Sequence, residues 1–520
     1  MKSLPLGTQS FSVLRNNDYL YVDKTEVIHR LITSGRVYFL SRPRRFGKSL
    51  LISTLYALFN GQKELFEGLY IYDKWDWEQT NPVLRIDFSG MGHDNADELM
   101  LSLTNFVDGI ARKYQFSLTE APLSDKFKEA IELLHQSTGR KVVILIDEYD
   151  KPIIDHITEI DSADANRKIL KSFFGVFKAV DEHLRFLMLT GVSKFTKVSI
   201  FSELNNLTDI TMDTKYAAIC GYTQTELETS FDENIEELAV LNGMDKPSAL
   251  LHLRKWYNGY SWDGETSVYN PYTTLLLFYH KAISNYWFES GSPTFLIDLM
   301  KQRDDIHLFM NPVVMPADAF TGYDISNIDT KTLLFQTGYL TIKSVQKVPM
   351  LPSIFTLGIP NDEVYNSLML FLVSGYANST PSETSQLRIE MQQQLREGDS
   401  EGLSRSLQAL LANIPYSLHI GSEKYYHSLF LSWIKMLGFD VQGEVMTNIG
   451  RIDAVWRQSG MTIVAEIKYH AAKKQASLLK KAMKQIKDRT YFEKYLPDKI
   501  MLLAVAFTGR EVGCKIEQLS

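Results

Sequence analysis

The segment Arg42-Pro43-Arg44-Arg45-Phe46-Gly47-Lys48-Ser49 decides how the first half of this chain folds. An apolar run at 37–40 precedes it, and a longer apolar run at 50–59 follows it. This order predicts a strand, a turn and then a helix that begins at Gly47-Lys48-Ser49. The first backbone N–H groups of a helix have no intrahelical partner and lie at the positive end of the helix dipole, so this turn can hold a phosphate.

The lysine and the hydroxyl group of this segment suit a nucleoside triphosphate. Lys48 can reach the terminal phosphates, and the Ser49 hydroxyl can bind Mg²⁺, as in the phosphate-binding loop (P-loop) of many ATPases. That loop has a glycine where this chain has Arg42, so the match is limited to Gly-Lys-Ser. The alternative interpretation is a basic turn before an ordinary helix.

A second segment carries acidic residues where such a site needs them. Residues 142–146 form a β-branched apolar run that ends in Asp147 and Glu148. Such a run predicts a central parallel strand, and ligands of open α/β sheets collect beyond the carboxyl ends of the strands. We therefore expect Asp147 to hold Mg²⁺, directly or through water, and Glu148 to polarise the attacking water. Taken alone, acidic residues after a strand also suit a helix cap or a turn.

Four segments together resemble the AAA-ATPase-like family of prokaryotic proteins. They are Tyr21-Val22-Asp23-Lys24-Thr25, residues 42–49, Ile146-Asp147-Glu148-Tyr149-Asp150-Lys151-Pro152 and Leu204-Asn205-Asn206-Leu207-Thr208-Asp209. The resemblance implies that the missing glycine is this family's own variant. The nucleotide-binding residues that it implies are Arg42, Arg44, Arg45, Phe46, Gly47, Lys48, Ser49 and Asp147.

The arginines of the loop have two possible roles. Arg42 and Arg44 can pair bidentately with phosphate oxygens, or they can be supporting groups that Asp23 or Asp150 holds. A further buried strand, 184–191, brings Thr190, Ser193 and Lys194 to the place where related ATPases carry a sensor residue. Candidates for an arginine finger are Arg85, Arg167 and Arg185, and the sequence does not choose among them.

The composition is that of an ordinary globular protein. The chain has 520 residues, which predicts about two to four domains. Its net charge of −7 gives no overall nucleic-acid footprint, so any such surface must be local. Cys220 and Cys514 lie far apart and support neither a disulfide framework nor a zinc site. There is no apolar signal region and no uncharged run of about 18 residues, so we expect a cytoplasmic protein without a membrane segment.

A second group of chemically important residues lies near the C-terminus. Two strand-like runs, 451–456 and 462–469, are joined by a turn. By the two-residue period of a strand, Val464, Glu466 and Lys468 share one face, and Asp453 can lie opposite Glu466. Clustered carboxylates are unfavourable unless a cation lies between them, so Asp453 and Glu466 are expected to hold Mg²⁺ and activate a water. Lys468 would stabilise charge on a phosphate, and Glu423 could complete the metal shell.

This arrangement resembles the PD-(D/E)XK nuclease superfamily. The two signature pieces are Gly450-Arg451-Ile452-Asp453 and Glu466-Ile467-Lys468, and Gln485-Ile486 resembles a motif of some branches. In the AAA-ATPase-like family such a domain commonly follows the ATPase. Residues 468–499 hold nine lysines and one arginine against three acidic residues, which suits a phosphate backbone. The alternatives are a cross-strand Glu–Lys pair on a solvated face and a solvated lysine-rich helix.

The expected fold is α/β: a P-loop NTPase parallel sheet with a helical lid subdomain, a helical connector and a C-terminal α/β restriction-endonuclease-like domain. The expected boundaries are 1–220, 221–360, 361–415 and 416–520. The aromatic segment 256–262 could stack bases, but few basic residues interleave with it, which favours a packing role.

The predicted function is an ATPase that controls a Mg²⁺-dependent nuclease, with ATP and Mg²⁺ as cofactors and nucleic acid, DNA rather than RNA, as the expected partner. The predicted catalytic residues are Glu148, Asp453, Glu466 and Lys468. The predicted metal ligands are Ser49, Asp147, Glu423, Asp453 and Glu466. The alternatives are a nucleotide-dependent switch in signalling or defence whose C-terminal domain binds nucleic acid without cutting it, and an interaction protein in which both sites are vestigial. The family resemblance also allows a homo-oligomer.

Overall fold

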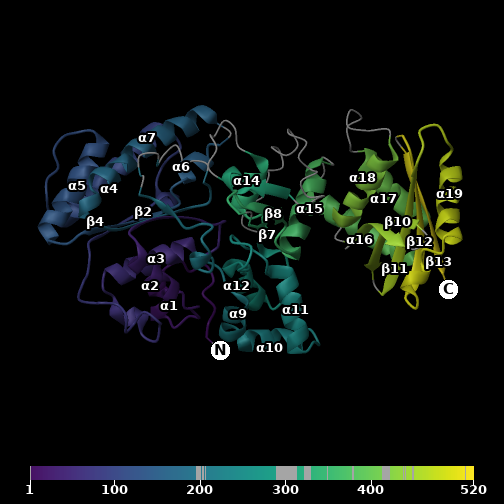
Figure 1. The fold of residues 1–520 in the computed structure, drawn as a ribbon, viewed down its shortest axis with the longest axis horizontal. Helices are drawn as coiled ribbons and strands as arrows, with labels where there is room; N and C mark the ends of the chain where they lie inside the picture. Colours follow the sequence, from purple (N-terminus) through teal and green to yellow (C-terminus); the bar gives the residue numbers. More distant parts are fainter. Residues whose placement is uncertain are drawn as a thin grey trace. The chain divides into compact units, whose positions relative to one another are not determined.

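A computed structural model describes residues 2–519, apart from 158, 195–200, 202–203, 205, 288–312, 321–328, 348, 377–379, 413–421, 437–438, 440, 448–449, 459 and 510. The chain divides into two compact units (Figure 1). The first contains Met1–Trp287 and Asn311–Val364, and the second contains Tyr365–Ser520. No helix among the described residues is long and apolar enough to cross a membrane.

The first unit is built on a five-stranded sheet in the order β2-β3-β4-β1-β5, with all neighbours parallel. Its strands are β1 (Val37–Ser41), β2 (Val83–Asp87), β3 (Val142–Asp147), β4 (Leu184–Gly191) and β5 (Thr208–Asp209). Strands β1 and β3 are buried along their whole length, as their continuous apolar sequences predict. The expected parallel α/β sheet is therefore confirmed. Because β4 lies between β1 and β3, the residues after these three strands reach one edge of the sheet.

Helices cover this sheet and complete its core. They are α1 (Phe11–Asn16), α2 (Thr25–Ser34), α3 (Lys48–Phe59), α4 (Ala96–Tyr114), α5 (Leu123–Thr138), α6 (Lys151–Ile154) and α7 (Ile160–Ala179). Helices α4, α5 and α7 pack on one another, and the rings of Phe127 and Phe173 stack at 4.3 Å between them. Helix α3 packs on β3, so the helix that begins at Lys48 lies beside the strand that ends at Asp147.

The rest of the first unit is a helical region with a small sheet. Its helices are α9 (Gln224–Ser230), α10 (Asp232–Leu241), α11 (Lys246–Tyr257), α12 (Pro271–His280) and α14 (Thr330–Thr337). Its strands are β6 (Val313–Pro316), β7 (Thr341–Gln346) and β8 (Ile354–Gly358), which form an antiparallel sheet in the order β6-β8-β7. The predicted helical middle of the chain is confirmed, and the β element expected near 337–345 is β7.

The second unit is a mixed sheet with helices. Its strands are β9 (Gln442–Thr447), β10 (Gly450–Gln458), β11 (Met461–Tyr469), β12 (Lys499–Thr508) and β13 (Glu511–Leu519). Its helices are α16 (Pro381–Glu397), α17 (Ser400–Ala412), α18 (Glu423–Met436) and α19 (Gln475–Asp488), and α15 (Asp362–Tyr376) spans the division between the units. The sheet order is β13-β12-β11-β10-β9, and β11 and β12 are parallel while the other neighbours are antiparallel.

The two faces of this second sheet carry different apolar clusters. Ile463, Ala465 and Ile467 of β11 belong to a cluster that includes residues of α16, α17 and α18. Val464 belongs to a second cluster, with residues of α19. The alternation expected for this strand is confirmed. Helix α17, which the sequence assigned to a connector, packs on β13 of this unit.

Candidate nucleotide and nuclease sites

The loop between β1 and α3 is shaped by two residues with left-handed backbone conformation. Gly47, with φ +91°, is the N-cap of α3, and Arg45 has φ +67°. Glycine adopts this conformation without a steric penalty, whereas arginine does so at a cost that the surrounding structure must offset. Lys48 and Ser49 follow as the first two residues of α3, as the sequence predicts.

Lys48 is held over its own loop. Its side chain is buried, and Nζ donates to the carbonyl oxygens of Arg42 and Pro43, each at 3.0 Å. Burial lowers the pKa of Lys48, and the nearby carboxylates of Asp147 and Glu148 oppose this effect. The structure therefore brings the loop lysine and the acidic end of β3 together.

Asp147 ends β3 and is almost completely buried. Its Oδ1 accepts from the Thr190 hydroxyl at 2.5 Å and from the Glu148 N–H at 3.1 Å. Glu148 itself has φ +52°, a strained conformation of the kind that occurs at functional sites. Burial raises the pKa of Glu148, and a raised pKa suits a carboxylate that accepts a proton from water.

Of the three expected sensor residues, Thr190 is the one that contacts Asp147. The Ser193 hydroxyl and N–H donate to Asp150 Oδ2 at 2.7 and 2.6 Å, which ties the ends of β3 and β4 together. Lys194 Nζ pairs with Asp209 Oδ2 at 3.1 Å. These two residues therefore brace the edge of the sheet.

The structure places the Arg42 side chain in the interior of the first unit, which does not favour the predicted contact with phosphate. Its side chain is 0% exposed, and Nη1 donates to the carbonyl oxygens of Ser41 and Thr211, each at 2.9 Å. Its guanidinium also stacks on the Trp262 ring, 4.0 Å from the ring centroid. These contacts are to groups other than Asp23 and Asp150. Arg42 supports the loop from inside.

The other large side chains of the loop divide into packing and exposed groups. Phe46 is buried edge-on against Tyr260, with ring centroids 4.8 Å apart, so the aromatic segment packs on the loop. Arg45 lies over the Tyr272 ring, 3.9 Å from its centroid. Arg44 is 61% exposed, with Nη2 4.0 Å from Asp155 Oδ1. Arg44 and Arg45 are exposed arginines that a phosphate can reach.

The second candidate site lies where β10 and β11 pair. Ala454 is opposite Ala465 in the antiparallel register, which places Asp453 beside Glu466. Asp453 Oδ2 accepts from the Ile467 N–H at 2.9 Å, and Lys468 Nζ donates to Glu466 Oε1 at 2.6 Å. The structure therefore brings these acidic and basic side chains together, as the sequence predicts.

Glu466 has the properties of a cation ligand. Its side chain is 1% exposed, and within the described part of the chain Oε2 is buried without a hydrogen-bond partner. Burial, followed by the negative charge of Asp453, raises the pKa of Glu466 to about 7. A buried carboxylate oxygen without a donor, close to a second carboxylate, fits a divalent cation.

Glu423 lies beside Lys468. This residue begins α18, is 55% exposed and lies with Oε1 3.6 Å from Lys468 Nζ. Across the described ranges, no three histidine, cysteine, aspartate or glutamate side chains form a group that could hold a metal ion. Glu423 is therefore a partner of Lys468. Burial disfavours the charge of Lys468, but Glu466 outweighs burial and raises the pKa of the lysine.

Two parts of the chain match known families. Residues 5–201 match the family described as "Predicted AAA-ATPase", and residues 421–517 match the PD-(D/E)XK nuclease superfamily. A protein of Azotobacter chroococcum mcd 1, described as an uncharacterized protein in the vnfD 5' region, is 39% identical over 529 residues. The match covers 100% of this chain and 99% of that protein. The chain belongs to the AAA-ATPase-like family. Its C-terminal part is a PD-(D/E)XK superfamily domain.

The arginine-finger candidates of this AAA-ATPase-like protein have local partners. Arg167 pairs with Asp164 of the same helix, and Arg85 Nη2 lies 3.6 Å from Asp87 Oδ2. Arg185 lies over the Phe59 ring, 5.8 Å from its centroid.

Two other segments that carry the family resemblance are 21–25 and 204–209. Lys24 Nζ pairs with Glu226 at 2.7 Å, while Asp23 accepts from the Thr25 and Tyr70 N–H groups. Asn205 lies outside the described residues.

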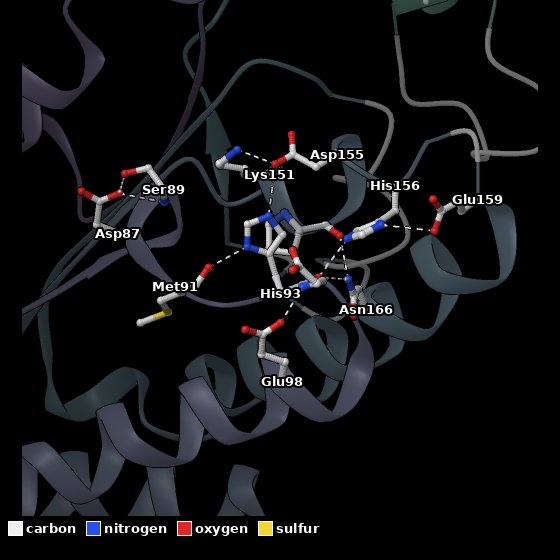
Figure 2. Close-up of polar contacts among 12 residues, drawn as sticks. Asp87, Ser89, Met91, His93, Glu98, Lys151, Asp155, His156, Glu159 and Asn166 are labelled. Atoms are coloured by element: carbon white, nitrogen blue, oxygen red, sulfur yellow. Dashed lines mark hydrogen bonds and ion pairs between the residues drawn. The ribbon is translucent and has the colours of Figure 1, made fainter.

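Sequence reasoning missed a polar network beside the acidic strand of this AAA-ATPase-like protein (Figure 2). His93 Nδ1 lies 2.7 Å from the Met91 carbonyl oxygen, and Nε2 lies 3.1 Å from Asp155 Oδ2. Because both ring nitrogens face acceptors, both can donate only when the ring is doubly protonated. Burial opposes the charge of Asp155, but hydrogen bonds from Lys151 and His93 outweigh it and lower its pKa. Only the Lys151–Asp155 spacing could have been read from the sequence.

A histidine also supports the second site. His427 Nε2 lies 2.9 Å from the carbonyl oxygen of Asp453, and its ring is almost completely buried. The contact ties α18 to β10 at the position of the expected metal ligand. The helical spacing of Glu423 and His427 places both on one face of α18. This spacing was the sequence signal that could have pointed to His427.

Proposed function

We propose that this protein binds and hydrolyses ATP at the loop 42–49 and that the ATPase half controls a Mg²⁺-dependent nuclease in the second unit. The observation that carries the proposal is the same in both units: a buried lysine lies beside a buried carboxylate at the end of a strand. The pairs are Lys48 with Asp147 and Lys468 with Glu466. We propose nucleic acid as the substrate of the second unit.

In the ATPase half, Ser49 and Asp147 are the residues proposed to hold Mg²⁺. The bound cation would neutralise phosphate charge. Lys48 has two carbonyl partners that it can exchange for phosphate oxygens, and Thr190 keeps Asp147 in place. Glu148, with its raised pKa, is proposed to accept the proton of the attacking water.

In the nuclease half, Asp453 and Glu466 are proposed to hold a divalent cation, which would supply an activated water. Lys468 remains charged because Glu466 raises its pKa, and it can stabilise negative charge on a phosphate. Helix α19 adds an exposed basic surface beside the sheet, which favours a polynucleotide over a small phosphate ester. The exposed lysines of and before this helix are Lys473, Lys474, Lys480, Lys481, Lys484 and Lys487.

Contacts within the first unit support the proposed control. Gly338 lies so close to the loop that a Cβ there would be 2.9 Å from Pro43 Cγ. From Gly338 the chain enters β7, where Lys343 Nζ donates to the Pro360 carbonyl oxygen at 2.9 Å. Asn361 then accepts from the Val364 N–H at the start of α15, the helix at which the second unit begins. A series of packed residues therefore connects the loop 42–49 to α15, and a movement of the loop can be transmitted along it.

The proposal is tested by a phosphodiesterase assay on DNA and RNA with Mg²⁺, with and without ATP. We expect cleavage that Asp453→Ala and Lys468→Ala abolish and that loses its dependence on ATP in Lys48→Ala. Arg457→Ala, an exposed position paired with Asp498, is the control and should leave the rate unchanged. Cleavage that survives Asp453→Ala and Lys468→Ala would overturn the nuclease site.

A second candidate function is a nucleotide-dependent switch that binds nucleic acid without cutting it. The observation that favours it is the two-carboxylate site: among the described residues, no third acidic side chain joins Asp453 and Glu466 as a metal ligand. This candidate predicts nucleic-acid binding without Mg²⁺-dependent cleavage and ATP binding without turnover.

A further inference from the structure

Arg489 follows α19 and lies on the side of the sheet that carries Glu466. Its Nη1 donates to the Tyr491 hydroxyl oxygen at 2.9 Å. Tyr491 is almost completely buried in the apolar cluster that contains Ile452 and Val464, neighbours in sequence of the proposed metal ligands. One end of the guanidinium is therefore fixed to the core beneath the site, although the side chain is exposed.

Gly450, the first residue of β10, packs closely against this guanidinium. A Cβ at Gly450 would lie 2.5 Å from Arg489 Nη1 and 3.1 Å from the Tyr491 hydroxyl oxygen, and Gly450 has φ +152°. A residue with a side chain would therefore be strained and would displace the arginine. Thr490, between the arginine and the tyrosine, has φ +43°, which is an outlier for a β-branched residue. The backbone at both positions is held in an uncommon conformation that keeps Arg489 beside β10.

Carboxylates offset the charge of several lysines in this unit, whereas Arg489 has no such partner among the described residues. Lys468 is shared by Glu466, at 2.6 Å, and Glu423, at 3.6 Å, so two carboxylates offset its charge. Lys484 and Lys487 of α19 pair with Asp488 and Glu517. Arg489 is in no ion pair of the residues that the structure describes, and its guanidinium lies against Gly450 of β10, the strand that carries Asp453.

A role limited to helix capping does not account for these features. A cation at a helix C-terminus gains from the helix dipole wherever its side chain points. A cation with this role alone needs neither a glycine packed against it on a strand nor a neighbouring residue with a strained backbone. An exposed, fixed guanidinium without a carboxylate partner has the chemistry of an oxyanion-binding group.

We propose that Arg489 binds a phosphate of the nucleic-acid backbone and holds the strand beside Asp453 and Glu466, and that Tyr491 is the positioning residue for Arg489. This inference rests on the proposed nuclease function of the second unit and adds a substrate-binding residue to it. Arginine has five N–H donors, of which Tyr491 takes one, so the fork retains donors for two oxygens of one phosphate.

The test is binding of a fluorescein-labelled DNA duplex of about 20 base pairs by the full-length protein, measured by anisotropy in Ca²⁺ over a range of KCl concentrations. Loss of one phosphate contact in Arg489→Ala should weaken binding about tenfold and reduce the slope of log K against log[KCl] by about 1. Arg489→Lys keeps the charge and should restore the slope but only part of the affinity. Tyr491→Phe should weaken binding in the same direction and by less.

Cleavage kinetics in Mg²⁺ provide the second readout. We expect Arg489→Ala to raise KM about tenfold and to change kcat less, because the contact is made before and during the reaction. Arg457→Ala is the matched control, since Arg457 is a 74% exposed arginine of β10 that pairs with Asp498. Its slope and KM should equal those of the wild type.

Each outcome decides the inference. Wild-type slope and KM in Arg489→Ala, with an unchanged melting temperature, would overturn it and leave Arg489 as a helix cap. If the wild type binds the duplex without cutting it, the proposed nuclease activity fails while the salt slope still decides the role of Arg489. If the wild type binds neither the duplex nor a single-stranded RNA of the same length, both are overturned.

Discussion

Replacing Glu466 with glutamine changes a buried charge whose effect on stability can be worked out from the structure. Burial, and then Asp453, raises the pKa of Glu466 from 4.5 to about 7 in the folded protein. Between these two pH values the folded protein binds a proton that the unfolded chain has released. Stability therefore falls as the pH rises from about 4.5 to about 7, and the full loss is present above pH 7.

The size of this effect follows from the difference between the two pKa values. At about 1.4 kcal/mol for each pKa unit, the ionised Glu466 lowers the free energy of unfolding of the metal-free protein by at most about 3 kcal/mol. Glutamine carries no charge at any pH, but it also removes the carboxylate partner that Lys468 has at 2.6 Å. We therefore expect Glu466→Gln to be more stable than the wild type by about 1–2 kcal/mol at pH 8 and by nothing at pH 4.5.

The assay is thermal unfolding of the full-length protein in EDTA at pH 4.5 and pH 8. For a unit of this size, 1 kcal/mol corresponds to about 2–4 °C in Tm, so the transition of the second unit should rise by several degrees at pH 8 only. Mg²⁺ should stabilise the wild type and not the variant. The control is Glu423→Gln, which removes an exposed partner of Lys468 and should show no pH-dependent gain. Equal destabilisation of Glu466→Gln at both pH values would refute the reasoning, because the ion pair would then outweigh burial.

Three further predictions concern the ATPase half. Arg42→Ala should lower the free energy of unfolding of the first unit by about 3–5 kcal/mol, measured by thermal unfolding. The reason is that the carbonyl oxygens of Ser41 and Thr211 lose the Arg42 donor. A stable variant that fails only in ATP binding would contradict this. Arg45→Ala should leave Tm unchanged and weaken ATP binding about tenfold, measured by calorimetry. The exposed Arg45 guanidinium can exchange its contact with the Tyr272 ring for a contact with a phosphate. An unchanged affinity for ATP would exclude a contact between Arg45 and phosphate. Thr190→Val removes the hydroxyl that donates to Asp147. It should lower the ATPase kcat about tenfold or more with little change in the Kd of ATP. An unchanged kcat would show that Asp147 does not need this hydrogen bond.

The features that sequence predicted well are those that local pattern determines. Continuous apolar runs specify buried parallel strands, and the residues directly after β1, β3 and β4 must meet at one edge of the sheet. For this reason the sequence alone places Lys48, Asp147 and Thr190 near one another. The two-residue period of β11 gave the shared face of Glu466 and Lys468 in the same way.

The features that sequence missed depend on partners far away in the chain. Arg42 sits inside the loop because Trp262 and Thr211 approach it from other parts of the first unit. No periodicity links these positions, so a surface role in phosphate binding was the natural prediction. The same holds for His93, whose ring contacts Asp155 across two elements. The position of Glu423 depends on the rotation of α18 about its axis, which the sequence does not give, and in the structure its Oε1 lies 3.6 Å from Lys468 Nζ.

Cleavage of linear DNA by the full-length protein in Mg²⁺, with the rate compared in the presence and absence of ATP, tests the proposed function most directly. We predict a rate that changes at least about tenfold with ATP in the wild type, does not respond to ATP in Lys48→Ala, and vanishes in Asp453→Ala. A rate that is the same with and without ATP, or one that persists in Asp453→Ala, would contradict the proposal.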